Sequence, residues 1–401
     1  MEVLKRLRSL TAVAAILAAT TLAACGGSKG DPAAPPTNVA VKAGDGRVTV
    51  TFNGQAGVDY WIFFAPGTGL TVDSWVNLPG AGVQRNAVSP AVISGLRNGQ
   101  LYSFTINGRT QGGPGGPASA TRTATPRLAG AEWVAGTALD AAELRGAVFG
   151  SPYVLVGTGG KIFSSPITDG RVYTALTSGT TADLNDVIVS GIAYIAVGAE
   201  GTVVGSSDAA ATWTTRTSGT TATLNSIAVG SGRFVAVGNG GTIVTSTDGT
   251  TFTPATSGTT ANLRRVTFSS LFVAVGDGGV ILTSTDGLTL TAATSNTTAN
   301  LRALALGFGL FIALGDDGAL VTSPDGTTWT ARPSIGPVNV RSATVASQGV
   351  AVGTGGAIYT SPDGVTWSAQ NSGSTANLLA VTRAIFGYVA VGSGGVVLSS
   401  E

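Results

Sequence analysis

Apolar and polar positions along residues 131–401 follow a repeated order of short apolar runs and polar turns. In the copy from Ser231 to Ser257, which reads SGRFVAVGNGGTIVTSTDGTTFTPATS, two apolar runs flank a glycine pair and a polar turn follows. Each run is only a few residues long, and glycine readily adopts the positive φ angles that a tight hairpin requires. The pattern therefore predicts short antiparallel strands joined by hairpins.

The glycine that follows the first apolar run recurs every 38 to 41 residues. A period of about 40 residues with several strands in each period is typical of propeller blades and not of helical solenoids. The recurring glycines are Gly157, Gly198, Gly238, Gly276, Gly315, Gly353 and Gly392. A further strand precedes each of them, and these innermost strands are expected to begin at Leu144, Leu184, Leu224, Leu263, Leu301, Val340 and Leu378.

The two ends of the repeated region complement each other. The chain stops at Glu401 after a third strand, whereas residues 131–136 supply a lone strand that begins near Trp133. If this strand completes the blade that Leu378 begins, a seven-bladed ring closes without exposed sheet edges. An open array would need capping repeats, which the sequence lacks. We therefore predict an all-β fold with a seven-bladed β-propeller over residues 131–401.

A polar turn after the third strand reads Ser-Pro-Asp-Gly-Thr-Thr-Trp from Ser323 to Trp329. It resembles the Asp box (BNR repeat) of sialidase-like propellers, shortened by one residue; the copy from Ser206 to Trp213 has full length, with Ala210 in place of glycine. The Asp carboxylate is expected to accept backbone N–H groups within its turn. We therefore assign structural roles, neither catalytic nor calcium-binding, to Asp208, Asp248, Asp286, Asp325 and Asp363.

The N-terminal segment, residues 1–24, combines basic residues with an apolar run, as secretory signals do. It ends in Leu22-Ala-Ala-Cys25, which resembles the lipobox of bacterial lipoproteins, and Cys25 is the only cysteine. The apolar stretch is short for a membrane-spanning helix. The resemblance implies lipidation of Cys25, and Gly26 after it favours the outer membrane. We expect a lipid-anchored protein of the bacterial cell envelope, either periplasmic or surface-exposed.

A second domain is expected between this anchor and the propeller. Residues 25–37 contain the lipidated Cys and a flexible linker rich in Gly, Ser and Pro, and residues 38–127 contain alternating strands without the 40-residue period. Leu96 and Tyr102 match the tyrosine corner of fibronectin type III domains, in which the phenol bonds back to the turn. The resemblance implies a β-sandwich, which we interpret as a spacer.

Composition excludes several kinds of chemistry. The chain has no His and a single Cys, which removes Ser-His-Asp catalysis, thiol catalysis and ordinary zinc sites. Its 22 basic and 21 acidic residues give no electrostatic reason to bind nucleic acid. The glycine turns join strand to strand, whereas a phosphate-binding loop leads into a helix. We expect no metal, no cofactor and no nucleic acid.

One polar constellation recurs with the repeat, at the second residue of each innermost strand. Pseudo-symmetry places these residues on one ring near a mouth of the central channel, where converging guanidinium groups favour carboxylate or phosphate. Ser/Thr loops such as Ser178 to Ala182 are expected to line the same rim. The alternative is an ordinary solvated rim. The candidate ligand-binding residues are Arg145, Asn185, Asn225, Arg264, Arg302 and Arg341, and the seventh position is Leu379.

Three functions remain open at this point. The repeat also resembles the seven-bladed assembly-factor propellers of photosystem II, which bind partner protein through an Arg-rich patch. The first hypothesis is a monomeric, non-enzymatic binding or scaffold lipoprotein whose ligand is an envelope protein or a glycan. The second is a glycoside hydrolase, sialidase-like or other, that uses Asp277 and Asp316 as its carboxylates. The third is a structural or adhesion component of the surface.

Overall fold

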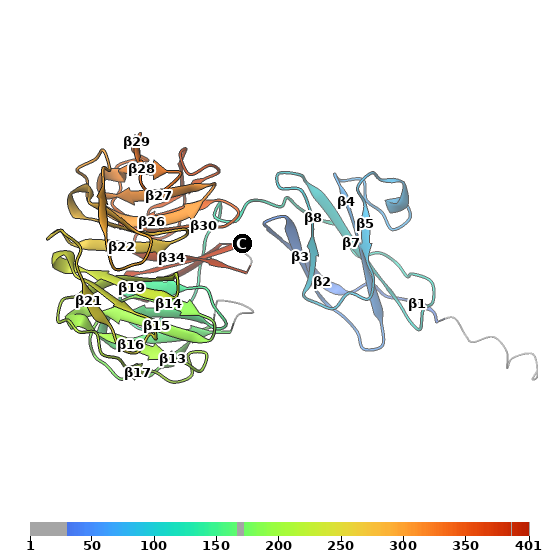
Figure 1. The fold of residues 1–401 in the computed structure, drawn as a ribbon. Coiled ribbons are helices and arrows are strands. Elements are labelled where there is room, and N and C mark those ends of the chain that lie inside the picture. Colours follow the sequence, from blue (N-terminus) through green and yellow to red (C-terminus); the bar gives the residue numbers. More distant parts are fainter. Residues whose placement is uncertain (1–29, 167–171, 386, 401) are drawn as a thin grey trace, which may run out of the picture. The chain divides into compact units, whose positions relative to one another are not determined.

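The computed structural model describes residues 30–166, 172–385 and 387–400, which fall into two compact units that divide between Pro126 and Arg127. The expected signal segment, Cys25 and the first part of the linker lie outside the described residues. Both units are built from β-strands, so the all-β prediction is confirmed (Figure 1). Within the described ranges, no helix has the length and apolar character needed to cross a membrane.

The first unit contains two sheets that enclose one apolar core. One sheet has the order β1-β7-β4-β5, with β8 also paired to β7, and the other has the order β2-β3-β6. Ile62, Phe104 and Ile106 are fully buried between them. The strands are β1 (Pro32–Ala33), β2 (Thr37–Gly44), β3 (Arg47–Asn53), β4 (Asp59–Pro66), β5 (Gly82–Gln84), β6 (Ala91–Ser94), β7 (Tyr102–Arg109) and β8 (Arg122–Ala124), and a short 3-10 helix, η1 (Trp75–Asn77), follows β4.

The hydroxyl of Tyr102 closes a turn of this unit. Its oxygen accepts a hydrogen bond from the backbone N–H of Arg97, at 3.2 Å. Leu96 is buried in the same core as Tyr102. The bond back to the turn is therefore present where the sequence pattern predicts it.

In the described part of the second unit, seven four-stranded antiparallel sheets follow one another. Their first strands are β10 (Leu144–Val148), β14 (Leu184–Ser190), β18 (Leu224–Gly230), β22 (Leu263–Phe268), β26 (Leu301–Gly307), β30 (Val340–Val345) and β34 (Leu378–Ala384). The second strands are β11 (Tyr153–Gly157), β15 (Ala193–Gly198), β19 (Arg233–Gly238), β23 (Phe272–Gly276), β27 (Leu310–Gly315), β31 (Gly349–Gly353) and β35 (Gly387–Gly392). All seven first strands begin at the Leu or Val that the sequence pattern indicates.

The outer half of each sheet is shorter. The third strands are β12 (Ile162–Ser165), β16 (Val203–Ser206), β20 (Ile243–Ser246), β24 (Ile281–Ser284), β28 (Leu320–Ser323), β32 (Ile358–Ser361) and β36 (Val397–Ser400). The fourth strands are β13 (Thr174–Leu176), β17 (Thr214–Thr215), β21 (Thr253–Ala255), β25 (Thr291–Ala293), β29 (Thr330–Arg332), β33 (Ser368–Gln370) and, for the last sheet, β9 (Val134–Ala135).

Second and third strands are joined by three-residue 3-10 turns. At the middle position Gly159, Gly240 and Gly278 take positive φ angles, and so do Glu200 and Asp317 at the same position. A side chain is therefore tolerated there, because it points into open space. The turns are η2 (Thr158–Gly160), η3 (Ala199–Gly201), η4 (Asn239–Gly241), η5 (Asp277–Gly279), η6 (Asp316–Gly318), η7 (Thr354–Gly356) and η8 (Ser393–Gly395).

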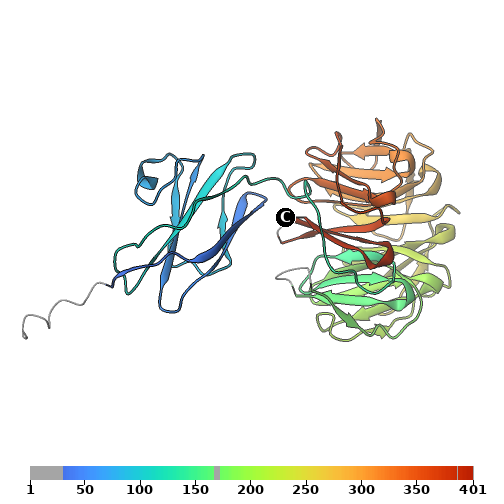
Figure 2. The same cartoon turned by 180° about the vertical axis from the view of Figure 1, so that it is seen from behind.

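The first strands form a closed cycle. Each contacts the first strand of the next sheet, and β34 of the last sheet contacts β10 of the first. The red strands of the last sheet accordingly lie beside the green strands of the first (Figure 1; seen from behind in Figure 2). β9 pairs with β36 through Val134↔Ser399 and Ala135↔Leu398. The lone strand expected at 131–136 thus supplies a two-residue ladder to the last sheet.

Packing between neighbouring sheets is almost entirely apolar. One buried cluster joins the first sheet to the second and contains Val156 from the first and Val187 and Tyr194 from the second. Similar clusters lie at the other sheet boundaries. Burying one such aliphatic side chain contributes roughly 1.5–3 kcal/mol. Because both faces of each sheet are covered in this way, the cycle holds its innermost strands in fixed positions.

The Asp boxes act within their own turns. In the box of β20, the Asp248 carboxylate accepts the backbone N–H groups of Thr250 (2.8 Å) and Thr251 (3.0 Å), and the Ser246 hydroxyl donates to it. Hydrogen bonds from the side chain of Thr250 and from these amides hold the pKa of Asp248 well below its ordinary value. In the longer box, Ala210 adopts φ 65°, the conformation that glycine takes in the shorter boxes.

Candidate functional site

The second residue of each first strand is the extra residue of a β-bulge. In every sheet the register of the first and second strands shifts across it, as between Leu263 and Arg265 around Arg264. A bulged residue has no partner in the ladder, so its side chain is aimed independently of the strand's alternation. We call these seven residues the ring positions: Arg145, Asn185, Asn225, Arg264, Arg302, Arg341 and Leu379.

Two ring arginines each bind an aspartate of their own sheet. The Arg264 guanidinium donates to both carboxylate oxygens of Asp277, from Nε at 2.8 Å and from Nη2 at 2.6 Å. Arg302 binds Asp316 in the same way, at 2.6 and 2.7 Å. Such forked pairs are short and directional. Both arginine charges are therefore compensated within the protein.

Asp277 and Asp316 are thus the acceptors of the ring arginines. The hydrogen bond from Arg264 lowers the pKa of Asp277, and the hydrogen bond from Arg302 lowers the pKa of Asp316. A catalytic acid needs a raised pKa in order to hold its proton near neutral pH. This environment keeps both carboxylates ionised, which does not suit the acid of a glycoside hydrolase.

Arg341 differs from these two arginines because Thr354 follows the anchor glycine of its sheet, where Asp277 and Asp316 stand in theirs. Among the described residues, Arg341 makes no hydrogen bond or ion pair, and it is half-buried. Burial lowers its pKa most, and the charge of Arg302 lowers it further. The charge of Asp316 raises this pKa by less, so Arg341 is a half-buried cation beside two other ring arginines, without a hydrogen-bonded or ion-paired partner of its own among the described residues.

Arg145 is held by acidic neighbours. Its guanidinium donates to Glu143 and to Asp183, each at 3.0 Å, and also to the side-chain oxygen of Asn185 at 3.2 Å. Asp183 and Asn185 belong to the next sheet's segment, so Arg145 spans a sheet boundary. This ring position is compensated as well.

The two ring asparagines serve as bridges between sheets. The Asn185 amide donates to the carbonyl of Leu224, at 2.9 Å, and the Asn225 amide donates to the carbonyl of Leu263, at 2.8 Å. Asn225 also donates to the side-chain oxygen of Asn239, at 2.9 Å. The structure thus places the six polar ring positions around one cycle, and Arg341 is the one whose polar group is not already engaged among the described residues.

A buried polar network beneath the ring was not foreseen from the sequence. Asp186, the residue after Asn185, is 2% exposed and lies 3.1 Å from Nη1 of Arg265. It also accepts a hydrogen bond from the Ser226 hydroxyl, at 2.8 Å. The three residues come from three successive sheets. Each of the three directly follows a ring position in the sequence. A polar residue at that place in an otherwise apolar strand is the sequence signal that could have indicated this buried network.

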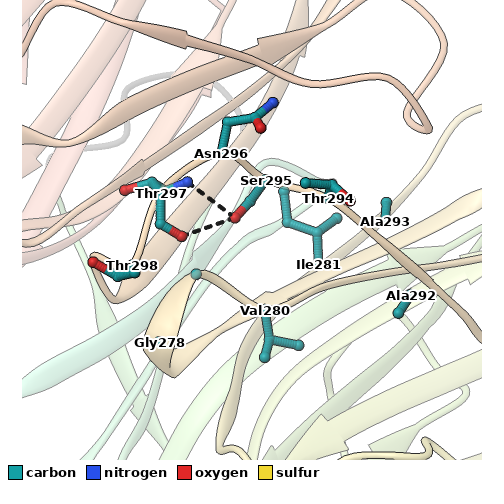
Figure 3. Close-up of a pocket in the computed structure, with 11 residues that line it drawn as sticks. Gly278, Val280, Ile281, Ala292, Ala293, Thr294, Ser295, Asn296, Thr297 and Thr298 are labelled. Atoms are coloured by element: carbon teal, nitrogen blue, oxygen red, sulfur yellow. Dashed lines mark hydrogen bonds between the residues drawn. The ribbon is translucent and has the colours of Figure 1, made fainter.

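The Ser/Thr loops do not present all their hydroxyls as expected. In the loop after β25, the Ser295 hydroxyl donates to the carbonyl of Thr297 and accepts its backbone N–H (Figure 3). Thr297 in turn accepts the backbone N–H of Ala299 with its own hydroxyl. The hydroxyls of Ser295 and Thr297 therefore stabilise the loop itself, whereas Thr298 is exposed.

These loops border shallow grooves away from the ring positions. One groove of about 750 Å³ lies between η5 and the segment from Ala292 to Thr298 (Figure 3). A similar groove of about 630 Å³ lies at the corresponding place of the preceding sheet. Both are lined by glycine, hydroxyl and aliphatic groups, the larger one also by the amide of Asn296, and no charged side chain lines either. Within the described residues, no group of three or more acidic, His or Cys side chains is placed to hold a metal ion.

The cycle of four-stranded antiparallel sheets makes the second unit a β-propeller. No protein-family model matches the chain, and no curated protein matches it in sequence. Among solved structures, YCF48 from Cyanidioschyzon merolae is similar over 68% of this chain and 99% of its own, with a TM-score of 0.55 and 17% identity. YCF48 bound to D1 peptide is similar over 67% and 94%, with a TM-score of 0.56 and 18% identity. The WD40 repeats of RRP9 match over 68% and 98%, with a TM-score of 0.55 and 9% identity.

Proposed function

We propose that this chain is a non-enzymatic scaffold protein whose seven-bladed propeller binds a partner protein at the ring positions. The observation that carries the proposal is Arg341, a half-buried guanidinium without a partner among the described residues. A carboxylate of the partner, from an acidic side chain or a chain terminus, would pair with it and relieve its repulsion with Arg302 and Arg264. A similar propeller of solved structure, YCF48, has been captured with a bound peptide.

The alternative of a glycoside hydrolase loses support from the same contacts. Its two candidate carboxylates, Asp277 and Asp316, are each locked to an arginine and kept ionised. No observation specifically favours hydrolysis or an adhesive surface role. The ring positions therefore favour binding without bond cleavage.

The anchoring of the scaffold is a separate part of the proposal. Leu22-Ala-Ala-Cys25 supports a lipid anchor on Cys25 at the outer membrane of a bacterial envelope. The strand pairings β2-β3-β6 and β5-β4-β7-β8, together with the Tyr102 turn, support a fibronectin type III-like spacer between the anchor and the propeller. We propose that this spacer and its linker hold a monomeric propeller away from the bilayer.

The binding function is tested by capture with the full-length protein in neutral detergent. Wild type and the Arg341→Ala variant are compared on the same envelope extract, with Arg332→Ala as the control. Arg332 is an arginine of the fourth strand β29, whereas the ring positions lie on first strands, and its removal changes the net charge equally. Wild type and the control are expected to retain one common partner that Arg341→Ala loses. Equal retention by all three proteins would reject the ring as the binding site.

Lipid anchoring is tested by metabolic labelling with an alkyne fatty acid. Wild type is expected to incorporate the label and to sediment with outer-membrane fragments. Cys25→Ala is expected to lose both properties. Label on the Cys25→Ala variant would disprove this anchor and leave the ring proposal unaffected.

A further inference from the structure

The outer face of the sheet that contains β5, β4 and β7 carries a stack of three planar side chains. Trp61 lies on the central strand β4, with the guanidinium carbon of Arg109 3.4 Å and that of Arg85 4.6 Å from its ring centroid. Arg109 is the last residue of β7, and Arg85 directly follows β5. β4 lies between β5 and β7 in the sheet (Figure 1). The indole thus contacts one cation from each of the two chain segments that flank its strand. We call Trp61, Arg85 and Arg109 the Trp61 clamp.

The clamp holds two positive charges without a paired anion. Among the described residues, neither Arg85 nor Arg109 forms an ion pair with a carboxylate. Asp59 lies opposite Arg109 in the strand register and raises the pKa of Arg109, but the larger effects of burial and of the Arg85 charge lower it. Two like charges close together repel each other, and cation–π contact with the indole offsets this repulsion only in part.

The inner half of the clamp is fixed, whereas the outer half is open. Nη2 of Arg109 donates to the side-chain oxygen of Asn107 at 3.2 Å, and the glycine-rich loop passes so close that a Cβ on Gly115 would lie 3.0 Å from that nitrogen. Nε of Arg109 and Nε1 of Trp61 are buried without a hydrogen-bond partner. Arg85 is exposed, so its hydrogen-bond donors are available to a ligand.

We propose that the Trp61 clamp binds the oxyanion groups of an acidic polysaccharide. Guanidinium groups bind carboxylate, sulfate and phosphate through paired N–H donors. Both guanidinium carbons lie within 4.6 Å of the centroid of one ring, so an oxyanion that the exposed Arg85 binds is also attracted by the charge of Arg109. A polymer that carries many oxyanions offers such a group repeatedly. Ligand binding relieves the repulsion between Arg85 and Arg109, which supplies part of the driving force. The clamp lies in the first unit and is independent of the ring positions.

The test uses the full-length protein in neutral detergent with a fluorescently labelled sulfated dextran as the probe. Fluorescence polarisation at fixed ionic strength is expected to show binding of the sulfated dextran that unlabelled, uncharged dextran does not displace. Arg85→Ala is expected to weaken binding about tenfold, since one charge-assisted contact is lost. Arg341→Ala is expected to bind as wild type does, which separates this site from the proposed protein-binding ring.

The matched control is Arg97→Ala, because Arg97 is an exposed arginine of the same unit outside the clamp. An equal loss in Arg85→Ala and Arg97→Ala would overturn the proposal, since net charge alone would then explain binding. Displacement by uncharged dextran would also overturn it. So would binding to vesicles that contain phosphatidylglycerol without binding to sulfated dextran, because the ligand would then be a lipid surface. Arg85 is exposed, so its substitution leaves the fold of the unit intact.

Discussion

The Tyr153 hydroxyl in the first propeller sheet accepts a hydrogen bond from the backbone N–H of Ile385 in the last sheet, at 2.9 Å. Tyr194 and Tyr388 make equivalent links: their hydroxyls donate to the carbonyls of Pro152 and Gln348 in the preceding sheets, each at 2.6 Å. At the same strand position, the third, fourth and fifth sheets carry Phe234, Phe272 and Phe311. The tyrosine links therefore cluster around the boundary where the two chain ends of the propeller meet.

These links predict a specific loss of stability in Tyr388→Phe. The fully buried Tyr388 hydroxyl also accepts the backbone N–H of Gln348, so its removal leaves two buried backbone groups of Gln348 without this partner. The free energy of unfolding is expected to fall by about 1–3 kcal/mol. Urea unfolding monitored by tryptophan fluorescence measures it. The control is Tyr359→Phe, a half-buried tyrosine that is expected to change stability little; an equal effect of both changes would contradict the role of the link.

Thr354→Asp is expected to supply Arg341 with the carboxylate that Arg264 and Arg302 already have. Because Thr354 stands where Asp277 and Asp316 stand, the new side chain should form a forked pair with Arg341. Affinity for the partner captured by wild type should fall about tenfold, through loss of one free cation. Thr354→Asn is the control of equal shape without charge, and it should bind as wild type does. Equal affinities of the Asp and Asn variants would show that the charge of Arg341 is not used.

Gly249→Ala is expected to be more destabilising than Gly240→Ala. Both glycines have positive φ angles, so both substitutions introduce backbone strain of order 1 kcal/mol. A Cβ on Gly249 would also lie 2.8 Å from Cδ1 of Ile195, whereas a Cβ on Gly240 meets nothing within 4 Å. Chemical denaturation of the two variants provides the comparison. Equal losses would mean that the Asp-box turn readily shifts away from Ile195.

The pH dependence of stability is expected to be flat near neutrality. The chain has no His, and the pKa values of Asp277 and Asp316 in the folded protein lie below their ordinary value. The same holds for Asp208, because hydrogen bonds from Ser206 and Thr212 lower its pKa to about 2. A carboxylate with a lowered folded-state pKa stabilises the protein above its unfolded pKa of about 4 and loses this contribution as the pH falls further.

Melting temperatures should therefore be constant between about pH 5 and pH 7.5 and decrease below about pH 4. Differential scanning calorimetry across this range provides the measurement. A stability transition near pH 6 would contradict the prediction, because no side chain of ordinary pKa titrates there in this sequence.

The sequence predicted the strand order of the propeller well because its determinants are local. A glycine such as Gly278 marks a positive φ angle, and an apolar start such as Leu263 marks a buried strand, without reference to any distant residue. The Asp-box contacts are local as well, since Asp248 and its donors lie within a few residues of each other. These signals repeat with the period, so each copy reinforces the assignment of the others.

The hydrogen bonds and ion pairs of the ring residues were harder to predict from the sequence. Arg264 meets Asp277 only because a hairpin brings together residues 13 positions apart in the chain, and the bulge that aims Arg264 has no local signature. Pseudo-symmetry suggested six equivalent ligand-binding side chains, whereas neighbouring groups already engage five of them. The sequence did hold one clue to this difference. An aspartate follows the anchor glycine in the sheets of Arg264 and Arg302, whereas Thr354 follows it in the sheet of Arg341.

The β-bulges place the ring residues outside the ladder hydrogen bonds of their strands. Substitution at Arg341 or Leu379 therefore leaves the pairing of its first strand with the second intact. In evolutionary terms, the proposed binding role would separate strand pairing from recognition, because each repeat carries one position whose side chain lies outside the ladder. Under this proposal, propellers with the same strand order would diverge toward different partners through changes at these seven positions.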